Sequence, residues 1–222
     1  DSKLVVLHSA PSAENDHITI TNNEINNGSS GMSFNGTTSN LKEFYLISNN
    51  TIQDFHCCGI HLSYFDSVQV RSNEIYAKTS GGNSEQSGIS AFNCDNNSNI
   101  LKNKIRVNAT STNTGIYLNY CDGTLSDRFL VANNFISCHN STSFSYGIYS
   151  FNSNYLNCYH NSINVTDGTS YGGRAMYLNG GSNIELLNNI FANTSEGYAI
   201  YTSSYPNISV SNYNNLFTEG TN

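Results

Sequence analysis

The sequence predicts an all-β solenoid, in which short coils of three strands stack on one another. Three observations support this prediction. Two short phrases recur in strict alternation along the 222 residues, they repeat every 23 to 31 residues, and the chain has only two prolines and no helical periodicity. Repeats of this length with short alternating strands are typical of stacked coils, because a single coil cannot bury its own apolar face.

The first phrase consists of alternating apolar residues, an asparagine, one further residue and usually isoleucine, as in ITITNNEI. Its asparagine occupies seven corresponding positions: Asn23, Asn50, Asn73, Asn103, Asn134, Asn161 and Asn189. Asparagine suits a tight turn because it tolerates left-handed backbone, and its amide can hydrogen-bond to the same amide one coil away. We therefore expect an asparagine ladder. Apolar residues two positions after it and three positions before it should form two interior columns.

The second phrase consists of a small residue, an apolar residue, any residue and usually another apolar residue, as in GIYL. It begins at Gly31, Gly59, Gly88, Gly115, Gly147, Ala175 and Ala199. In a strand, positions one and three after the small residue point to one face, and positions two and four point to the other. Position two should therefore form an outward column, which reads Ser33, His61, Ser90, Tyr117, Tyr149, Tyr177 and Tyr201.

These h-x-h-x-x-N-x-I and G-I-x-h units resemble the repeats of the pectate-lyase-like superfamily, especially its asparagine-rich secreted bacterial members. The resemblance extends from about Ile18 to Phe217. It implies a single-stranded right-handed parallel β-helix of about eight coils. It also places the asparagine ladder between the second and third strands of each coil, and the G-I-x-h phrase in the first strand. Enzymes of the superfamily bind polysaccharide on the outer face of that strand, but the fold carries many activities and does not fix this one.

Composition narrows the class of protein. Nine Lys and Arg stand against sixteen Asp and Glu, and the net charge of −7 disfavours nucleic acid as a partner. No apolar run approaches the roughly 18 residues of a membrane span. We expect one parallel β-helix domain over residues 1–222, secreted or at the cell surface. Neither end shows a polar cap, so we expect it to be a fragment of a larger protein whose other domains are partners.

The outward aromatic column is the candidate binding face. Tyr117, Tyr149, Tyr177 and Tyr201 lie on consecutive coils, and His61, Phe92 and Phe151 should share their face. Long loops precede this strand, at residues 75–88, 105–115, 136–147 and 163–175, and they should form the walls of a groove beside the aromatic column. Tyrosine offers a flat apolar surface and a hydroxyl, so we expect a non-catalytic module that recognises a polysaccharide or other glycan. Stacked aromatics also stabilise a parallel sheet without any ligand, which leaves a structural spacer or adhesin stalk as an alternative.

Aspartates form a second column, seven positions after the small residue. Asp66, Asp95 and Asp122 would be about 5 Å apart on adjacent coils, a spacing that suits glycoside hydrolysis or calcium ligation. They are the candidate catalytic residues if the protein is a polysaccharide lyase or glycoside hydrolase. Aspartate is also a favoured turn residue, and the characteristic catalytic motifs of the superfamily are missing. We therefore predict no catalysis and no cofactor, with calcium as the alternative.

Cysteine and histidine raise two further questions. The segment HCCGIH, residues 56–61, is dense in metal ligands, but if the strand extends over the whole segment, alternation turns His61 and Cys57 outward and Cys58 and His56 inward. The ligands would not converge, so we expect no metal site there. Cys94 and Cys121 share one register on adjacent coils, which would place their Cα atoms about 4.8 Å apart, within the range of a disulfide.

Overall fold

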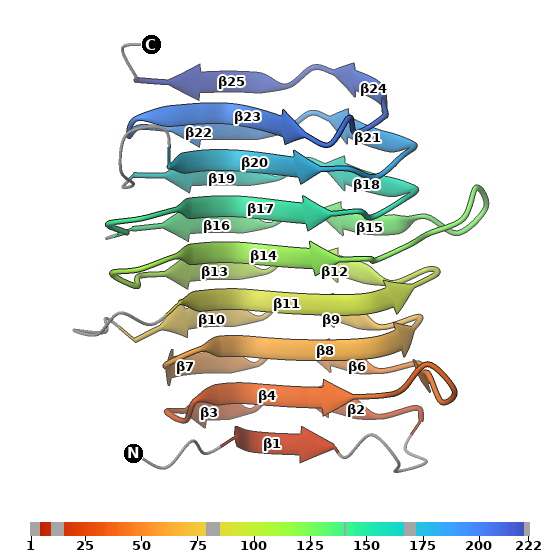
Figure 1. Ribbon diagram of the computed structural model, residues 1–222. Helices are drawn as coiled ribbons and strands as arrows, with labels where there is room; N and C mark the ends of the chain where they lie inside the picture. The colour runs from red at the N-terminus through yellow and green to blue at the C-terminus, as the bar shows by residue number, and fades with distance from the viewer. Residues whose placement is uncertain (1–4, 10–15, 79–84, 140, 167–171, 220–222) are drawn as a thin grey trace.

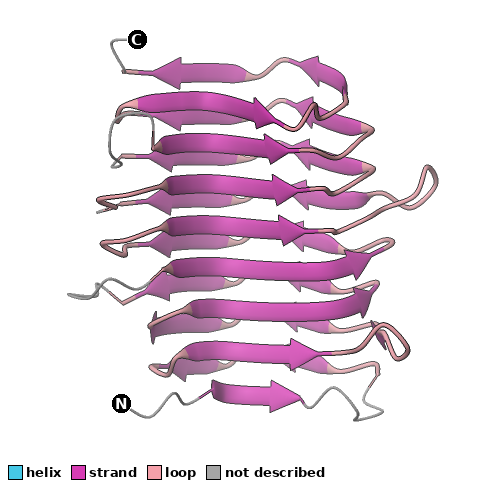
Figure 2. Ribbon diagram, in the orientation of Figure 1, coloured by secondary structure: helices cyan, strands magenta, loops and turns pink. Residues whose placement is uncertain are grey.

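The computed structural model describes residues 5–9, 16–78, 85–139, 141–166 and 172–219. These residues form three parallel sheets and no helix, which confirms the predicted all-β class (Figure 2). Each coil adds one strand to each sheet in turn, and the coils wind in the right-handed sense from the N-terminus to the C-terminus (Figure 1). None of the described segments is a helix that could cross a membrane.

The three sheets run along the whole stack. Sheet 1 contains β1 (Val5–Ser9), β4 (Ser30–Asn35), β8 (Cys58–Asp66), β11 (Gln86–Asp95), β14 (Asn113–Asn119), β17 (Ser145–Phe151), β20 (Gly173–Asn179) and β23 (Gly197–Ser203), with the short β5 (Lys42–Glu43) paired to β8. Sheet 2 contains β2 (Thr19–Thr21), β6 (Leu46–Ser48), β9 (Gln69–Arg71), β12 (Asn99–Leu101), β15 (Phe129–Ala132), β18 (Leu156–Tyr159), β21 (Ile184–Leu187) and β24 (Ile208–Asn212). Sheet 3 contains β3 (Glu24–Asn26), β7 (Thr51–Phe55), β10 (Glu74–Ala77), β13 (Lys104–Val107), β16 (Phe135–Cys138), β19 (Ser162–Val165), β22 (Ile190–Asn193) and β25 (Asn215–Thr218).

The number of coils agrees with the predicted value. The described strands form eight successive triplets, and the seven steps from β1 to β23 in sheet 1 correspond to about seven full turns. The G-I-x-h phrase forms the strands of sheet 1, and the asparagine ladder lies between sheets 2 and 3, as the resemblance implied. The fold thus places one long strand per coil on the face predicted to bind a ligand.

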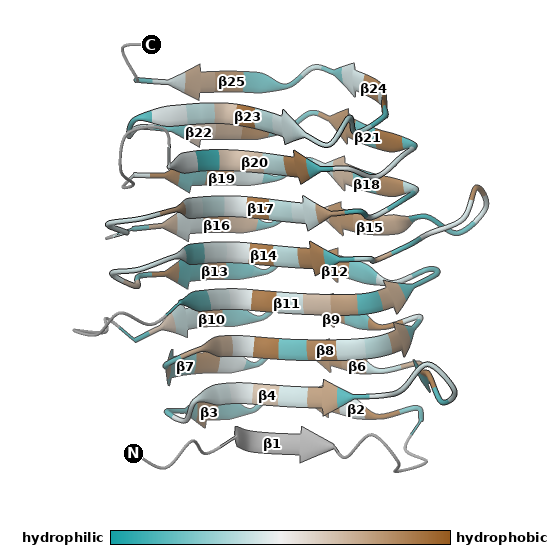
Figure 3. Ribbon diagram, viewed as in Figure 1, coloured by the Kyte–Doolittle hydropathy of each residue, from teal (hydrophilic) through white to brown (hydrophobic). Residues whose placement is uncertain are grey.

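Apolar columns fill the interior. The isoleucines two positions after each ladder asparagine pair in register from Ile25 to Ile163, and Phe191 continues the column. The second predicted column, from Ile20 to Leu186, is also in register and buried. Bands of apolar and polar residues alternate along the strands of sheet 1, because successive side chains point into and out of the coil (Figure 3).

The asparagine ladder is continuous. The backbone N–H and the side-chain amide of Asn103 both donate to Oδ1 of Asn134, at 3.0 and 3.1 Å. Asn134 repeats this pattern toward Asn161, and its amide also donates to the carbonyl of Ile100 at 2.9 Å. The same bonds recur at the other coils, and Asn214 adds an eighth member that the sequence prediction did not include. Each amide therefore satisfies backbone groups that the turn would otherwise leave buried and unpaired.

The prediction that the ladder asparagine itself adopts left-handed backbone is wrong. The residue immediately before it has positive φ in each coil, for example 57° at Asn133, 56° at Lys102 and 54° at His160. Four of the preceding residues are also asparagine, which favours this conformation, but the other four are Ser72, Lys102, His160 and Tyr213, so the turn does not depend on one residue type. The buried asparagine fixes the turn through its side-chain hydrogen bonds, and its neighbour accepts the left-handed conformation.

The column of small residues in sheet 1 has a steric cause. A Cβ on Gly147 would lie 2.1 Å from Cγ2 of Ile163, across the same coil, and 2.5 Å from the carbonyl oxygen of Ala175. Gly31, Gly59, Gly88 and Gly115 face the same conflict with an isoleucine Cγ2 at 2.2 to 2.5 Å. In the two coils that carry alanine, the corresponding residue of sheet 3 is Phe191 or Leu216, neither of which has a Cγ2 methyl. The identity of the small residue therefore depends on branching at the facing side chain.

Cys94 and Cys121 are fully buried on adjacent coils, and both thiols are free in this structure. Burial raises the pKa of the Cys94 thiol well above its usual value, and the neighbouring Cys121 raises that pKa further. Sγ of Cys121 donates to the carbonyl of Ala91 at 3.3 Å. The two thiols are thus neighbours, as the shared register predicted.

We expect these two cysteines to form a disulfide when the protein folds under oxidising conditions. The raised pKa of the Cys94 thiol disfavours its thiolate in the folded state, so the bond should form during refolding in a glutathione redox buffer rather than on later addition of oxidant. Mass spectrometry of a non-reduced digest should recover the two peptides cross-linked. Recovery of both cysteines as alkylated thiols after oxidative refolding would contradict the prediction.

Candidate functional site

The predicted outward column of sheet 1 is present. Tyr117, Tyr149, Tyr177 and Tyr201 are direct register partners on β14, β17, β20 and β23. Ser90, His61 and Ser33 continue the column toward the N-terminus. On β14, Ile116 and Leu118 are fully buried, whereas Tyr117 between them is half-buried. The tyrosines therefore lie on the outer face because the strand alternates about a buried core.

The rings form an unbroken series of contacts. We name Phe92, Tyr117, Tyr149, Tyr177 and Tyr201 the aromatic stripe. Its ring centroids are 5.3, 5.0, 4.5 and 5.4 Å apart in order, and only the Tyr149–Tyr177 pair is stacked nearly parallel, at 12°. His61 extends the series at 5.4 Å from Phe92. Phe151 does not join it, because its ring packs edge-on against Tyr120 instead.

Sequence reasoning missed a second group of rings beside the stripe. Tyr146, Arg174 and Tyr198 are register partners one position before the small residue. The Tyr146 ring lies 5.2 Å from Tyr149, and the guanidinium of Arg174 lies 4.2 Å from the Tyr201 ring centroid and 4.7 Å from that of Tyr177. Two aromatics and an arginine at this position on three consecutive coils are the signal that could have revealed the group.

Polar contacts fix the orientation of the phenols. Asn119 donates to the Tyr117 hydroxyl at 2.9 Å, and Arg174 donates to the Tyr146 hydroxyl at 3.1 Å. Burial raises the pKa of Tyr117, and Tyr149 raises it further. Burial also raises the pKa of Tyr146 to about 12, although the charge of Arg174 opposes the shift. Both phenols therefore stay protonated at neutral pH and remain hydrogen-bond donors.

A groove of about 320 Å³ adjoins the stripe. Its lining combines rings of the face with polar residues from the segments that precede the strands, namely Glu85, Gln86, Ser87, Thr112, Thr114, Tyr117, Phe144, Tyr146 and Tyr149. Loops at the predicted positions thus supply a wall, although residues 79–84, 140 and 167–171 of these loops lie outside the described part of the chain. The site offers flat apolar surface beside amide, hydroxyl and carboxylate groups.

The aspartate column lies where the chain leaves sheet 1: Asp66 and Asp95 are the last residues of β8 and β11, and Asp122 follows β14. Asp66 and Asp95 are register partners, and the backbone N–H of Asp122 donates to Oδ1 of Asp95 at 3.1 Å. Oδ1 of Asp122 accepts from the backbone and the side chain of Asn154, at 2.8 and 2.9 Å. Burial raises the pKa of Asp95, and the charges of Asp122 and Asp66 raise it further, while the hydrogen bond from Asp122 lowers it. Oδ2 of Asp66 accepts from the side chain of Asn96 at 3.4 Å, so all three carboxylates act as acceptors for the next coil.

The potential metal ligands of residues 56–61 point in different directions, some into the core and some toward solvent. Cys58 is buried and Cys57 is exposed, as strand alternation predicted. His56, predicted to point inward, is exposed, because β8 begins only at Cys58 and the alternation does not reach it. Within the described ranges, no three His, Cys, Asp or Glu side chains lie close enough to hold a metal ion.

Comparison of the chain with models of protein families, with curated proteins and with solved structures finds no significant match.

Proposed function

We propose that the aromatic stripe binds an extended polysaccharide, and that the protein is a non-catalytic carbohydrate recognition module, secreted or held at a cell surface. The observation that carries the proposal is the continuous ring surface from Phe92 to Tyr201 beside a polar groove. Sugar rings have apolar faces that lie flat on aromatic rings, while their hydroxyls need polar partners. Protonated phenols and the groove's amide and hydroxyl groups supply such partners.

The assignment of the chain to a protein superfamily is part of the same proposal. The ladder phrase and the small-residue phrase support membership of the pectate-lyase-like superfamily, of the asparagine-rich secreted bacterial type. Other domains of a parent protein would then position the module. Because individual sugar contacts are weak, affinity should rise with oligosaccharide length as more coils are engaged.

The lyase or hydrolase alternative has less support. Oδ1 of Asp95 and Oδ1 of Asp122 already accept hydrogen bonds from the following coil, and both residues lie where the chain leaves sheet 1, outside the stripe. We propose no cofactor for binding. If calcium at this column contributed, chelation with EDTA would reduce the affinity.

The test is the double variant Tyr149→Ala/Tyr177→Ala, studied after a glycan array has identified a ligand. Removing both rings should weaken binding of a long oligosaccharide by about tenfold to a hundredfold, at about 0.5–1.5 kcal/mol per lost ring contact. Calorimetric titration measures the loss. The matched control is Tyr205→Ala/Tyr213→Ala, which removes two strongly exposed tyrosines outside the stripe and should bind as the wild type does.

The spacer alternative predicts a different result. If the rings serve only to pack the sheet, the wild type will bind no glycan on the array, and Tyr149→Ala/Tyr177→Ala will simply melt at a lower temperature. Equal affinities of the stripe variant and the wild type for the array ligand would also overturn the proposal.

A further inference from the structure

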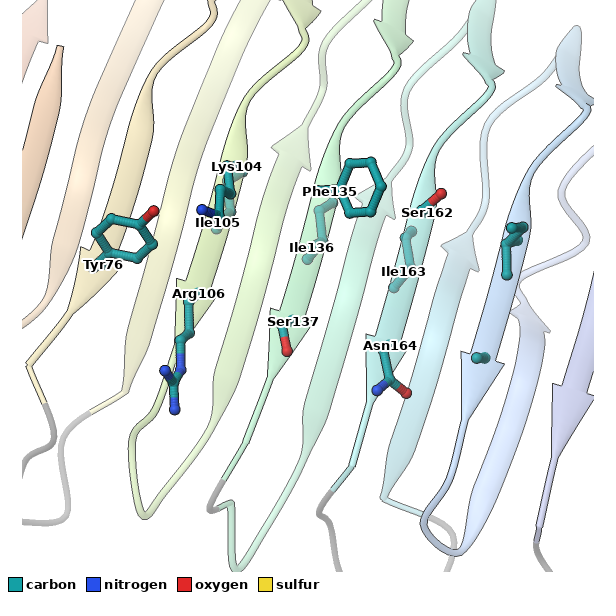
Figure 4. Close-up of a pocket in the computed structure, with 12 residues that line it drawn as sticks. Tyr76, Lys104, Ile105, Arg106, Phe135, Ile136, Ser137, Ser162, Ile163 and Asn164 are labelled. Carbon is teal, nitrogen blue, oxygen red and sulfur yellow. The ribbon is translucent and has the colours of Figure 1, made fainter.

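A second groove, of about 620 Å³, lies on the outer face of sheet 3 (Figure 4). It crosses five strands from β10 to β22, and its lining shares no residue with the aromatic stripe. Phe135 is 67% exposed and Ile190 is 46% exposed, although both are large apolar side chains. We name this surface the sheet 3 groove. Exposed apolar residues gathered in a concave surface are typical of binding sites.

The side chains that line the groove form two columns along the solenoid axis. Arg106, Ser137 and Asn164 are register partners on β13, β16 and β19, and form a polar column. Phe135 of β16 and Ile190 of β22 lie on the other outward column, two coils apart, with Ser162 of β19 in register between them. Along the solenoid axis from Arg106, the groove thus presents a cation and then large apolar side chains on alternate coils. From the coil of Arg106 to that of Ile190 it spans three rungs, or roughly 14 Å.

Within the described ranges, Arg106 is the unpaired cation of the groove. Arg106 is exposed and makes no hydrogen bond or ion pair with any residue that the structure describes. Lys104 on the same strand differs, because it is the register partner of Glu74 and its Nζ lies 5.7 Å from the Tyr76 ring centroid. The remaining strands of the groove, β16, β19 and β22, carry no charged residue. A chain of net charge −7 therefore presents an unpaired positive charge beside apolar surface.

The other two side chains of the polar column are uncharged. The Ser137 hydroxyl is hydrogen-bonded to Nε2 of His139, whose Nδ1 is hydrogen-bonded to the Thr166 hydroxyl at 2.7 Å. Asn164 carries a neutral amide. Of the three groups in the polar column, Arg106 alone can hold an anion through charge-assisted hydrogen bonds.

We propose that the sheet 3 groove binds the free carboxylate of an amphiphilic acid, such as a medium-chain alkanoate. Arg106 would hold the carboxylate with two parallel hydrogen bonds, and the alkyl chain would run along the axis over Phe135 toward Ile190. A peptide fits less well, because every strand beneath the groove already pairs its backbone with adjacent coils and offers none to a ligand. An esterified acyl chain fits less well too, since it has no carboxylate for Arg106.

Calorimetric titration with decanoate, decanol and methyl decanoate, each below its micelle concentration, tests the proposal. The wild type should bind decanoate at least about tenfold more tightly than the two neutral compounds. Arg106→Gln should abolish this preference and leave the weak binding of decanol unchanged. Phe135→Ala should weaken decanoate and decanol alike, because it removes apolar surface and no charge. Hexanoate should bind about tenfold or more weakly than decanoate.

Two controls locate the effect. Arg71→Gln removes the same charge from an exposed site on sheet 2, outside the groove, and should bind decanoate as the wild type does. Tyr149→Ala/Tyr177→Ala should also bind decanoate normally, whether or not the stripe binds glycans. The proposal is overturned if decanoate and decanol bind equally, if Arg71→Gln has the same effect as Arg106→Gln, or if loss of the stripe abolishes decanoate binding.

Discussion

Replacing Asn134 with leucine should lower the free energy of unfolding by roughly 2–6 kcal/mol, at about 1–3 kcal/mol for each buried group left unpaired. The substitution removes the acceptor of the Asn103 backbone N–H and the donor that reaches the carbonyl of Ile100. Asn134 is fully buried, so water cannot replace either partner. Denaturant unfolding followed by circular dichroism measures the change.

The matched control for this variant is Asn164→Leu. Asn164 is exposed on the outer face of sheet 3 and makes no hydrogen bond with any residue in the described ranges. Its replacement should shift the unfolding free energy by less than about 0.5 kcal/mol. An unfolding midpoint for Asn134→Leu that equals that of the wild type would mean that the ladder bonds do not stabilise the turn.

The second large effect is expected at Gly147. Its replacement with alanine should destabilise the protein by about 1–3 kcal/mol, because the new Cβ would overlap Cγ2 of Ile163, 2.1 Å away. Ile163→Leu removes that methyl branch. In the double variant Gly147→Ala/Ile163→Leu the loss should be smaller than the sum of the two single losses, by about 1–2 kcal/mol. Denaturant unfolding of the wild type, the two single variants and the double variant gives the four free energies of this double-mutant cycle.

The next coil already combines alanine at the small-residue position with a facing side chain that has no Cγ2 methyl, as the double variant would. Ala175 lies in the register of Gly147, and Phe191, which lacks the methyl branch, pairs with Ile163 in sheet 3. Ala175→Gly is the control, and it should cost less than Gly147→Ala because it creates no overlap. If the losses of Gly147→Ala and Ile163→Leu simply add, the steric explanation of the glycine column is wrong.

The sequence predicted the fold well because its determinants are periodic. One buried asparagine and one buried isoleucine per coil are enough to place each coil, since both must be in register with their neighbours. The left-handed residue was predicted one position too late, because asparagine, which favours that conformation, also occurs before the ladder at Asn22, Asn49, Asn133 and Asn188. The inward orientation of His56 was predicted only for a strand that reaches it, and β8 begins at Cys58; the start of this strand is not marked in the sequence.

The candidate sites differ in how much the sequence reveals. The stripe was predictable because the same residue type recurs at one position of four consecutive coils. Tyr146 and Arg174 were missed because they precede the small residue, a position that we assigned to the loop although β17 and β20 include it. The sheet 3 groove left no periodic signal, since Arg106, Phe135 and Ile190 differ in type and belong to different coils. Only the register of the sheets brings them together.

The direction of the hydrogen bonds between coils also determines how the molecule would respond to force. The three sheets are parallel and stacked, so their inter-coil bonds, and those of the asparagine ladder, point along the solenoid axis. Tension along that axis would be shared within each rung by three sheets and one ladder, while successive rungs act in series. One rung would therefore separate before the others, and each remaining stack would keep its own core. Under tension the solenoid would act as a stiff rod that breaks at its weakest joint, and not as a spring that lengthens evenly.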